Sequence, residues 1–169
     1  MALLPILCYP DPKLQTVAKP VQAVNARIRT LISDMFETMY EAKGIGLAAT
    51  QVNVHECLVV IDVSEQRDQP LVLINPKMVW ASPEIHLNEE GCLSVPGVHD
   101  SVPRHDAVQI DAQDAEGHLH QIEAEGLLSV CIQHEMDHLL GRVFVEYLSL
   151  LKRNRIKIKM LKAQRETTD

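Results

Sequence analysis

The sequence predicts an α+β domain, in which short antiparallel and mixed strands pack around a central helix, with an N-terminal helix and a C-terminal helix beside them. Three observations lead to this prediction. An early stretch carries apolar residues at helical spacing, short apolar runs bounded by turn residues fill the middle of the chain, and a longer helical stretch follows them. The length of 169 residues is that of a single domain.

The N-terminal part of the chain predicts an extended segment followed by a helix. Prolines punctuate the residues up to Pro20, and Asn25 is a plausible helix N-cap. The next apolar residues are spaced as on one face of an amphipathic helix, and we expect Gly44 and Gly46 to end it. These apolar residues are Ile28, Leu31, Ile32, Met35, Phe36, Met39 and Tyr40.

The middle of the chain predicts short strands joined by turns. Residues 57–63 and 71–74 are apolar runs typical of buried strands, with a polar loop between them. Residues 76–89 are expected to hold two more short strands around a turn at Ser82-Pro83. Residues 106–112 are expected to pair with residues 118–124 across Glu116-Gly117.

Two helices complete the predicted domain. Leu127 to Leu140 forms the central helix, with Gly126 before it and Gly141 at its end. Residues 152–164 form the final helix. This order of strands followed by helices is the basis for the α+β assignment.

The central helix contains the most informative pattern in the chain, Gln133-His134-Glu135-Met136-Asp137-His138. Two histidines four residues apart lie on the same helical face, one turn apart, so that both imidazoles can hold one metal ion. Glu135 is then placed to take a proton from a water on that metal. The pattern is typical of metal-assisted hydrolysis, and it makes this the metal-binding helix.

Two histidines leave a catalytic metal one protein ligand short. Phe144 stands where one metalloprotease pattern has its third histidine, and no downstream carboxylate is a convincing substitute. Cys131 lies seven residues before His138, a helical span of roughly 10 Å, which a short side chain bound at about 2.3 Å does not bridge.

Cys92 is the upstream residue that best completes the metal site. It lies between Gly91 and Gly97, where the backbone can turn and approach a metal closely. We therefore expect Cys92, His134 and His138 to hold the metal and to leave one coordination position open.

Three segments of the chain together resemble the peptide deformylase family in its bacterial type 1 form. In chain order they are Gly44-Ile45-Gly46-Leu47-Ala48-Ala49-Thr50-Gln51, Glu90-Gly91-Cys92-Leu93-Ser94 and the histidine motif. The resemblance extends to residues 34–40 and 72–76 and covers nearly the whole chain. One motif alone would be weak evidence, whereas three in the right order and spacing are strong.

The resemblance implies an enzyme that removes the formyl group from the N-terminal formylmethionine of nascent proteins and releases formate. It implies one Fe(II) ion per chain, for which nickel, cobalt or zinc can substitute. Glu135 would act as the general base. The developing oxyanion would be held by the metal, the side-chain amide of Gln51 and the backbone N–H of Leu93.

The resemblance also implies which residues contact the peptide. Small residues at Gly44 and Gly46 let an extended substrate pair with the chain like an added strand. The backbone of Ile45, Gly46 and Gly91 is expected to make that pairing. The slot for the methionine side chain is expected to be lined by Ile45, Leu127, Val130 and Cys131.

Two departures from the family pattern lie beside this cleft. Lys43 stands where related chains often carry an acidic residue, and Val98-His99-Asp100 replaces a segment where an arginine is common. Neither departure touches the expected metal ligands. Both bear on contacts around the site and on the preference for residues beyond methionine.

Charge is distributed unevenly along the chain. From residue 152 onward seven basic and two acidic residues give a net charge of +5, whereas the remainder, with nine basic and 21 acidic residues, carries −12. A basic tail is either a solvated helix face or a nucleic-acid contact. The resemblance favours docking on the ribosome, so residues 1–151 are expected to be the catalytic part and residues 152–169 a basic C-terminal helix and tail of the same domain.

The composition predicts a cytoplasmic protein. No apolar run is long enough to span a bilayer, and the first residues lack the basic start of a signal peptide. Four cysteines without a paired framework indicate reduced thiols, which a cysteine metal ligand also requires. We expect neither a membrane nor a DNA partner.

Three other functions stay open on the sequence. A metal-dependent peptidase that uses the same helix is the main alternative, and it needs neither Gln51 nor Cys92. A structural metal would need a fourth ligand, and none is evident. A ribosome-binding module would leave the three motifs unexplained.

Overall fold

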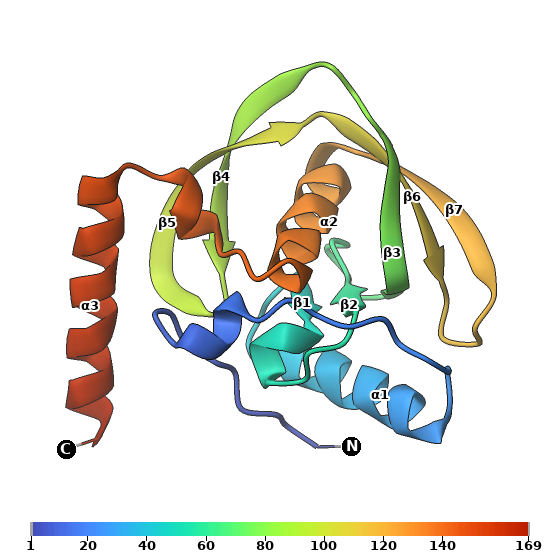
Figure 1. Cartoon of the computed structure of the whole chain (residues 1–169), viewed down its shortest axis with the longest axis horizontal. Helices are drawn as coiled ribbons and strands as arrows, with labels where there is room; N and C mark the ends of the chain where they lie inside the picture. Colours follow the sequence, from blue (N-terminus) through green and yellow to red (C-terminus); the bar gives the residue numbers. More distant parts are fainter. Residues whose placement is uncertain (1, 169) are drawn as a thin grey trace.

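The computed structural model describes residues 2–168 and has the α+β architecture that the sequence predicts (Figure 1). The three α-helices within those residues are α1 (Ala26–Glu41), α2 (Gly126–Leu139) and α3 (Leu150–Thr168). Short 3₁₀ helices occupy Pro12–Gln15, Ala49–Val52 and Phe144–Tyr147. The strands are β1 (Gly46–Ala48), β2 (Leu58–Ile61), β3 (Leu71–Ala81), β4 (Ile85–Cys92), β5 (Val95–His105), β6 (Ala107–Gln113) and β7 (Leu119–Glu125).

The strands form two sheets around α2. One sheet has the order β1-β2-β3-β6-β7, and the other consists of β4 and β5. All strand pairs among the described residues are antiparallel, and the expected parallel component is one isolated bridge between Lys19 and Glu56. Figure 1 shows α2 at the centre, with β4 and β5 on one side and β3, β6 and β7 on the other.

The larger sheet is covered on both faces, which explains why β2 is apolar at every position. Val59 and Ile61 pack with residues of α2 such as Ile132. The alternate residues of β2, Leu58 and Val60, pack against α1. Because successive side chains of a strand point to opposite faces, a strand buried between two helical layers shows no alternation in its sequence.

The first helix begins and ends close to where the sequence predicts. The side chain of Asn25 accepts a hydrogen bond from the Ile28 N–H at 3.1 Å, as an N-cap does. The helix ends at Glu41, and Lys43 takes the left-handed conformation after it, with φ of 59°. The Gly44 N–H returns to the carbonyl of Met39 at 2.9 Å, which closes the helix end and starts the segment toward β1.

The region after residue 74 agrees with the sequence expectation in its break at Ser82-Pro83 and differs in the length of the strands. The strand before the break is the continuation of β3 through Pro76 to Ala81, and the strand after it, β4, runs from Ile85 to Cys92. The register of β3 against β6 shifts after Ile74, because an irregularity accommodates the proline. The strand β5 was not predicted, because Pro96 and Pro103 argue against a strand and are tolerated only at the edge of a sheet.

The last helix is longer than expected and lies at the margin of the molecule. It begins at Leu150, two residues before the predicted start, and Figure 1 shows it beyond β5. Its buried residues Ile156 and Met160 pack with Val95 and Val98 of β5 and with Phe144. Residue 169, the end of the expected basic tail, lies outside the described residues. No helix within residues 2–168 is both long enough and apolar enough to cross a membrane.

Candidate metal centre

The structure brings the three expected metal ligands together. Cys92 ends β4, while His134 and His138 lie one turn apart on α2. The Cys92 Sγ is 3.4 Å from the His138 Nε2, and the two Nε2 atoms of the histidines are 3.2 Å apart. One ligand atom from each residue lies within 4.8 Å of the other two, as binding of one ion requires.

A hydrogen bond at Nδ1 leaves the metal-facing Nε2 of His134 available, whereas the buried Nδ1 of His138 has no hydrogen-bond partner among the described residues. The His134 Nδ1 is 2.7 Å from a carboxylate oxygen of Glu90, and we assign the proton to Nδ1, so that Nε2 carries the lone pair. Both histidines are buried, and burial lowers the pKa of His138 well below its usual value, with His134 and Arg104 adding to that shift. His138 is therefore neutral, the form that binds a metal.

The surroundings of the three ligand atoms favour a positive charge between them. Burial alone would lower the pKa of His134, but Glu135, Cys92 and Glu90 raise it well above its usual value. Two imidazole nitrogens and a sulfur that face one another need a shared proton or a metal ion. A divalent cation with nitrogen and sulfur ligands fits this donor set.

A buried network of charges supports His134 from behind. Arg104 of β5 is 3% exposed, and its guanidinium donates to both carboxylate oxygens of Glu90 at 2.6 and 2.9 Å. Its third contact is with Asp137 at 2.7 Å, and the Tyr147 hydroxyl donates to the same carboxylate oxygen at 2.7 Å. Because Glu90 and Arg104 stabilise each other's charge in the interior, Glu90 stays available to orient His134.

Sequence reasoning missed this network, although one signal was present. Glu90 lies two residues before Cys92 and Asp137 lies directly before His138. Carboxylates adjacent to buried metal ligands need a cationic partner if they are buried too. This signal indicates a buried cation near Cys92 and His138, but nothing in the sequence singles out Arg104 among the arginines.

Glu135 is enclosed beside the metal ligands. It is 3% exposed, and its Oε1 has no hydrogen-bond partner among residues 2–168. Burial raises the pKa of Glu135 to about 7, a shift that the neighbouring His134 partly opposes. A carboxyl group with this pKa can accept and return a proton near neutral pH.

Gln51 is also buried, and its side chain connects β1 to the second motif. Its Oε1 accepts a hydrogen bond from the Ala48 N–H at 2.9 Å. Its Nε2 donates to the Ser94 hydroxyl at 3.0 Å and faces the Cys92 sulfur at 3.5 Å. The amide N–H₂ is thus held at the edge of the ligand cluster, where the sequence analysis expects an oxyanion donor.

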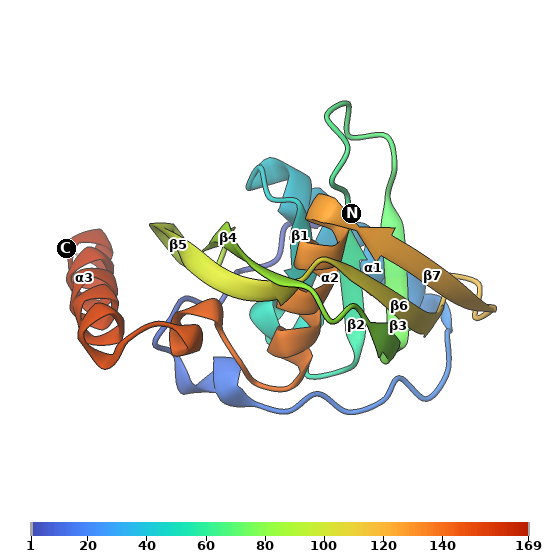
Figure 2. The ribbon, with the colours of Figure 1, turned by 90° about the horizontal axis from the view of Figure 1, so that it is seen from above.

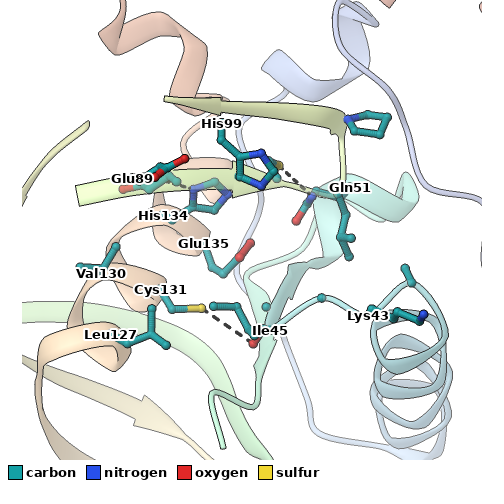
Figure 3. Close-up of a pocket in the computed structure, with 18 of the residues that line it drawn as sticks. Lys43, Ile45, Gln51, Glu89, His99, Leu127, Val130, Cys131, His134 and Glu135 are labelled. Atoms are coloured by element: carbon teal, nitrogen blue, oxygen red, sulfur yellow. Dashed lines mark hydrogen bonds and ion pairs between the residues drawn. The ribbon is translucent and has the colours of Figure 1, made fainter. Parts of the chain in front are cut away.

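A cavity of ≈ 440 Å³ opens beside these residues (Figure 3). In the figure Leu127, Val130 and Cys131 follow one another along α2, with Ile45 opposite Cys131. All the expected substrate contacts line this cavity, as do Lys43 and His99 at the two departures from the family pattern. The expected contacts are Gly44, Ile45, Gly46, Gly91, Leu127, Val130 and Cys131, together with Gln51, Leu93 and Glu135.

The strand β1 presents a free edge to this cavity. The Ile45 carbonyl accepts a hydrogen bond from the Asp62 N–H at 2.8 Å, so it points toward β2 and not toward the cavity. Gly46 stands opposite Ile61, and by the alternation of an antiparallel pair its N–H and C=O point the other way. Gly46 therefore offers backbone groups to an added strand, while the Ile45 carbonyl does not.

Comparisons with known proteins agree with one another. A family model described as polypeptide deformylase matches residues 3–154. Peptide deformylase 1 of Ralstonia nicotianae is 61% identical over 166 residues, which are 98% of each chain. The crystal structure of a peptide deformylase from Legionella pneumophila matches with a TM-score of 0.93 and 43% identity over 98% of each chain. The peptide deformylase from Ehrlichia chaffeensis in complex with actinonin gives a TM-score of 0.95 at 42% identity, over 98% of this chain and 99% of that one.

Proposed function

This chain belongs to the peptide deformylase family, enzymes that remove the formyl group from the N-terminus of nascent proteins, and we propose that it does so with Cys92, His134 and His138 as metal ligands. The observation that carries this assignment is the convergence of those three side chains, two of which, Cys92 and His134, line the cavity together with Glu135. The comparisons do not support the alternative of a metallopeptidase that uses the same helix.

The family is metal-dependent, and we propose Fe(II) as the resident ion, with nickel, cobalt or zinc as substitutes. When bound, the metal would supply Lewis-acid activation of a water near neutral pH. Thiolate-bound ferrous iron is sensitive to oxygen, so activity should fall during aerobic purification and return in an oxygen-stable form with nickel or cobalt. Full activity with zinc alone would contradict the iron assignment.

Glu135 performs the proton transfers in this proposal. Its carboxylate takes the proton of the attacking water and returns it to the leaving amine, which frees the N-terminus of the protein and releases formate. The raised pKa of about 7 suits a group that must both accept and donate. Its burial keeps bulk water away from the proton in transit.

Gln51 and Leu93 stabilise the oxygen that becomes negative when the formyl carbon is attacked. The Gln51 amide would turn one N–H from its long contact with Cys92 toward that oxygen, while the contact to Ser94 holds the side chain in place. The backbone N–H of Leu93 is the second donor. Fixed donors of this kind stabilise a developing oxyanion without reorganising during the reaction.

The substrate lies between β1 and β4 as an added strand. Gly46 and Gly91 provide backbone groups on the two sides, and Gly44 leaves room for the peptide. The methionine side chain enters the apolar part of the cavity formed by Ile45 with Leu127, Val130 and Cys131 on α2.

Residues 1–151 form the catalytic part of the domain in this proposal, and residues 152–169 form a basic C-terminal helix and tail that contacts the ribosome. The residues that line the cavity lie between Ala42 and Glu135, which separates chemistry from the basic helix. Lysines and arginines on an exposed helix suit a phosphate backbone. We place the enzyme in the cytoplasm, where nascent chains emerge and a cysteine ligand stays reduced.

One assay tests the proposed reaction. Formate release is measured from formyl-Met-Ala-Ser and from the acetylated peptide, with the metal-loaded wild type and with Glu135→Ala. We expect release from the formyl peptide by the wild type alone. Cleavage at an internal peptide bond, or undiminished turnover by Glu135→Ala, would contradict the proposal.

A further inference from the structure

The loop between β2 and β3, residues 62–70, contacts the part of the cavity wall formed by Gly44, Ile45 and Gly46, which we call the β1 wall. Figure 2 shows it projecting from the end of the larger sheet. Arg67 in this loop is half-buried and donates from Nη1 to the Gly44 carbonyl at 2.8 Å and to the Asp62 carbonyl at 3.1 Å. The Asp62 N–H holds the next carbonyl, that of Ile45, at 2.8 Å. Two consecutive carbonyls of the wall are therefore fixed by the loop.

Arg67 is itself held in a defined position. Its guanidinium carbon lies 5.8 Å from the centre of the Tyr40 ring, a cation–π contact. The Tyr40 hydroxyl donates to the buried Asp62 carboxylate at 2.6 Å, and the Ser64 N–H donates to the other carboxylate oxygen at 3.0 Å. Arg67 has a φ of 57°, a left-handed backbone conformation that residues other than glycine rarely adopt. The contacts of the loop therefore hold Arg67 in a disfavoured backbone conformation.

The contact at Gly44 bears on the width of the cavity because of what lies on the other side of this residue. A Cβ built on Gly44 would be 2.7 Å from the Leu93 Cδ1, so Gly44 packs directly against that side chain. Arg67 holds Gly44 by its carbonyl, and Gly44 abuts Leu93. The position of Gly44 thus sets the separation between the β1 wall and the segment that carries Leu93.

We propose that Arg67 is a positioning residue for deformylation, which fixes the β1 wall at Gly44 so that the cleft is already spaced for an extended formyl peptide. This inference rests on the proposed function of the cavity. Arg67 is not among the residues that line the cavity, and its contacts are with Gly44, Asp62 and Tyr40. Its loss should therefore weaken binding equally in the ground state and the transition state, which raises KM and leaves kcat nearly unchanged.

The test compares Arg67→Met, which keeps the apolar stem and removes the donors, with Arg67→Lys, which keeps one donor. In the nickel-loaded enzyme we expect Arg67→Met to raise KM for formyl-Met-Ala-Ser roughly tenfold, as loss of a charge-assisted hydrogen bond does, with kcat within threefold. Arg67→Lys should recover part of the loss. Arg27→Met, which removes an arginine paired with Glu56 on the surface, is the matched control and should leave both constants unchanged.

Amide hydrogen exchange gives a readout that is independent of turnover. Residues 44–48 should exchange faster in Arg67→Met than in the wild type, while α2 exchanges at the same rate. If wild-type enzyme releases no formate, the proposed function fails. If the wild type is active and Arg67→Met keeps its KM within twofold, or loses kcat or metal instead, the positioning role is overturned. Should Arg67→Met not fold, Arg67→Gln, which has a shorter side chain, takes its place, and a wild-type KM together with unchanged exchange at residues 44–48 then overturns the role.

Discussion

The helices α2 and α3 differ in which side chains depart from the usual placement of polar residues outside and apolar residues inside. In α2 the polar residues Gln133, His134, Glu135 and His138 are buried, whereas in α3 Leu150, Leu151 and Ile158 are at least 61% exposed. The polar residues of α2 are tolerated inside because neighbouring strands supply partners, as Glu90 does for His134. In α2 the buried side chains include those proposed to take part in the reaction. In α3 the buried side chains, Ile156 and Met160, attach the helix to the rest of the domain. Changes in α2 should therefore alter the reaction, and changes in α3 should not.

Glu135→Gln should have the largest effect and is the sharpest test of α2. The amide keeps the size of the side chain but cannot accept the proton, so kcat should fall by roughly 10²–10⁴-fold. Metal content and thermal stability should stay near the wild-type values. Formate release and metal analysis on the same sample check both points, and a loss of metal would point to a structural role instead.

Gln51→Ala should lower kcat by roughly 10²–10³-fold, because it removes one donor to the developing oxyanion. Gln51 is not one of the proposed metal ligands, although its Nε2 faces the Cys92 sulfur at 3.5 Å, so the variant should still bind one cobalt ion per chain. Activity within a few-fold of the wild type would refute the role of Gln51.

Arg104→Met tests the network behind the metal site. It leaves the buried Glu90 without its charged partner, so we expect a loss of roughly 3–5 kcal/mol in the free energy of unfolding and a 10–100-fold loss of metal affinity. Chemical denaturation and competition with a chelator measure the two quantities. Arg27→Met, on the surface, serves as the control and should change neither.

The same network should set the stability of the protein at low pH. Burial alone would raise the pKa of Glu90, but hydrogen bonds from Arg104 and His134 bring it below the usual 4.5. A carboxyl whose pKa is lowered in the folded state stabilises the protein above 4.5, and this contribution is lost as the pH falls through the lower value. The stability of Arg104→Met should therefore depend less on pH than that of the wild type as the pH falls below 4.5.

Charge reversal on α3 should have the smallest effect on the chemistry. Lys157→Glu combined with Lys162→Glu changes exposed residues, for which stability changes of less than about 0.5 kcal/mol are usual. Turnover of formyl-Met-Ala-Ser should stay within twofold, while co-sedimentation with ribosomes at low salt should weaken. Unchanged co-sedimentation would remove the ribosome contact from the proposal and would leave the catalytic assignment intact.

The sequence predicted the parts of this molecule whose constraints are local. The spacing of His134 and His138 follows from helix geometry, and the start of α1 follows from the side chain of Asn25. Cys92 could be selected among four cysteines because its glycine-rich surroundings permit close approach. In each case the residues that determine the local structure lie within a few positions of one another in the sequence.

The parts that could not be predicted depend on partners far along the chain. Arg104 is separated from Asp137 by 33 residues, and no local pattern pairs them. The strand β5 is stabilised by its ladder with β4, which outweighs the two prolines that argue against a strand. Arg67 lies in a stretch that reads as an ordinary polar loop, and its contact with Gly44 spans 23 residues.

Gly46 and Glu135 fill adjoining space where β1 meets α2. A Cβ built on Gly46 would lie 2.6 Å from the Glu135 Oε2 and 2.8 Å from the Cys131 Sγ, so the seam between strand and helix has no room for one more carbon atom. A larger residue at position 46 would therefore require a compensating change at residue 131 or residue 135. An inhibitor that packs against this seam would therefore contact a surface in which a larger side chain at residue 46 displaces Glu135 or Cys131.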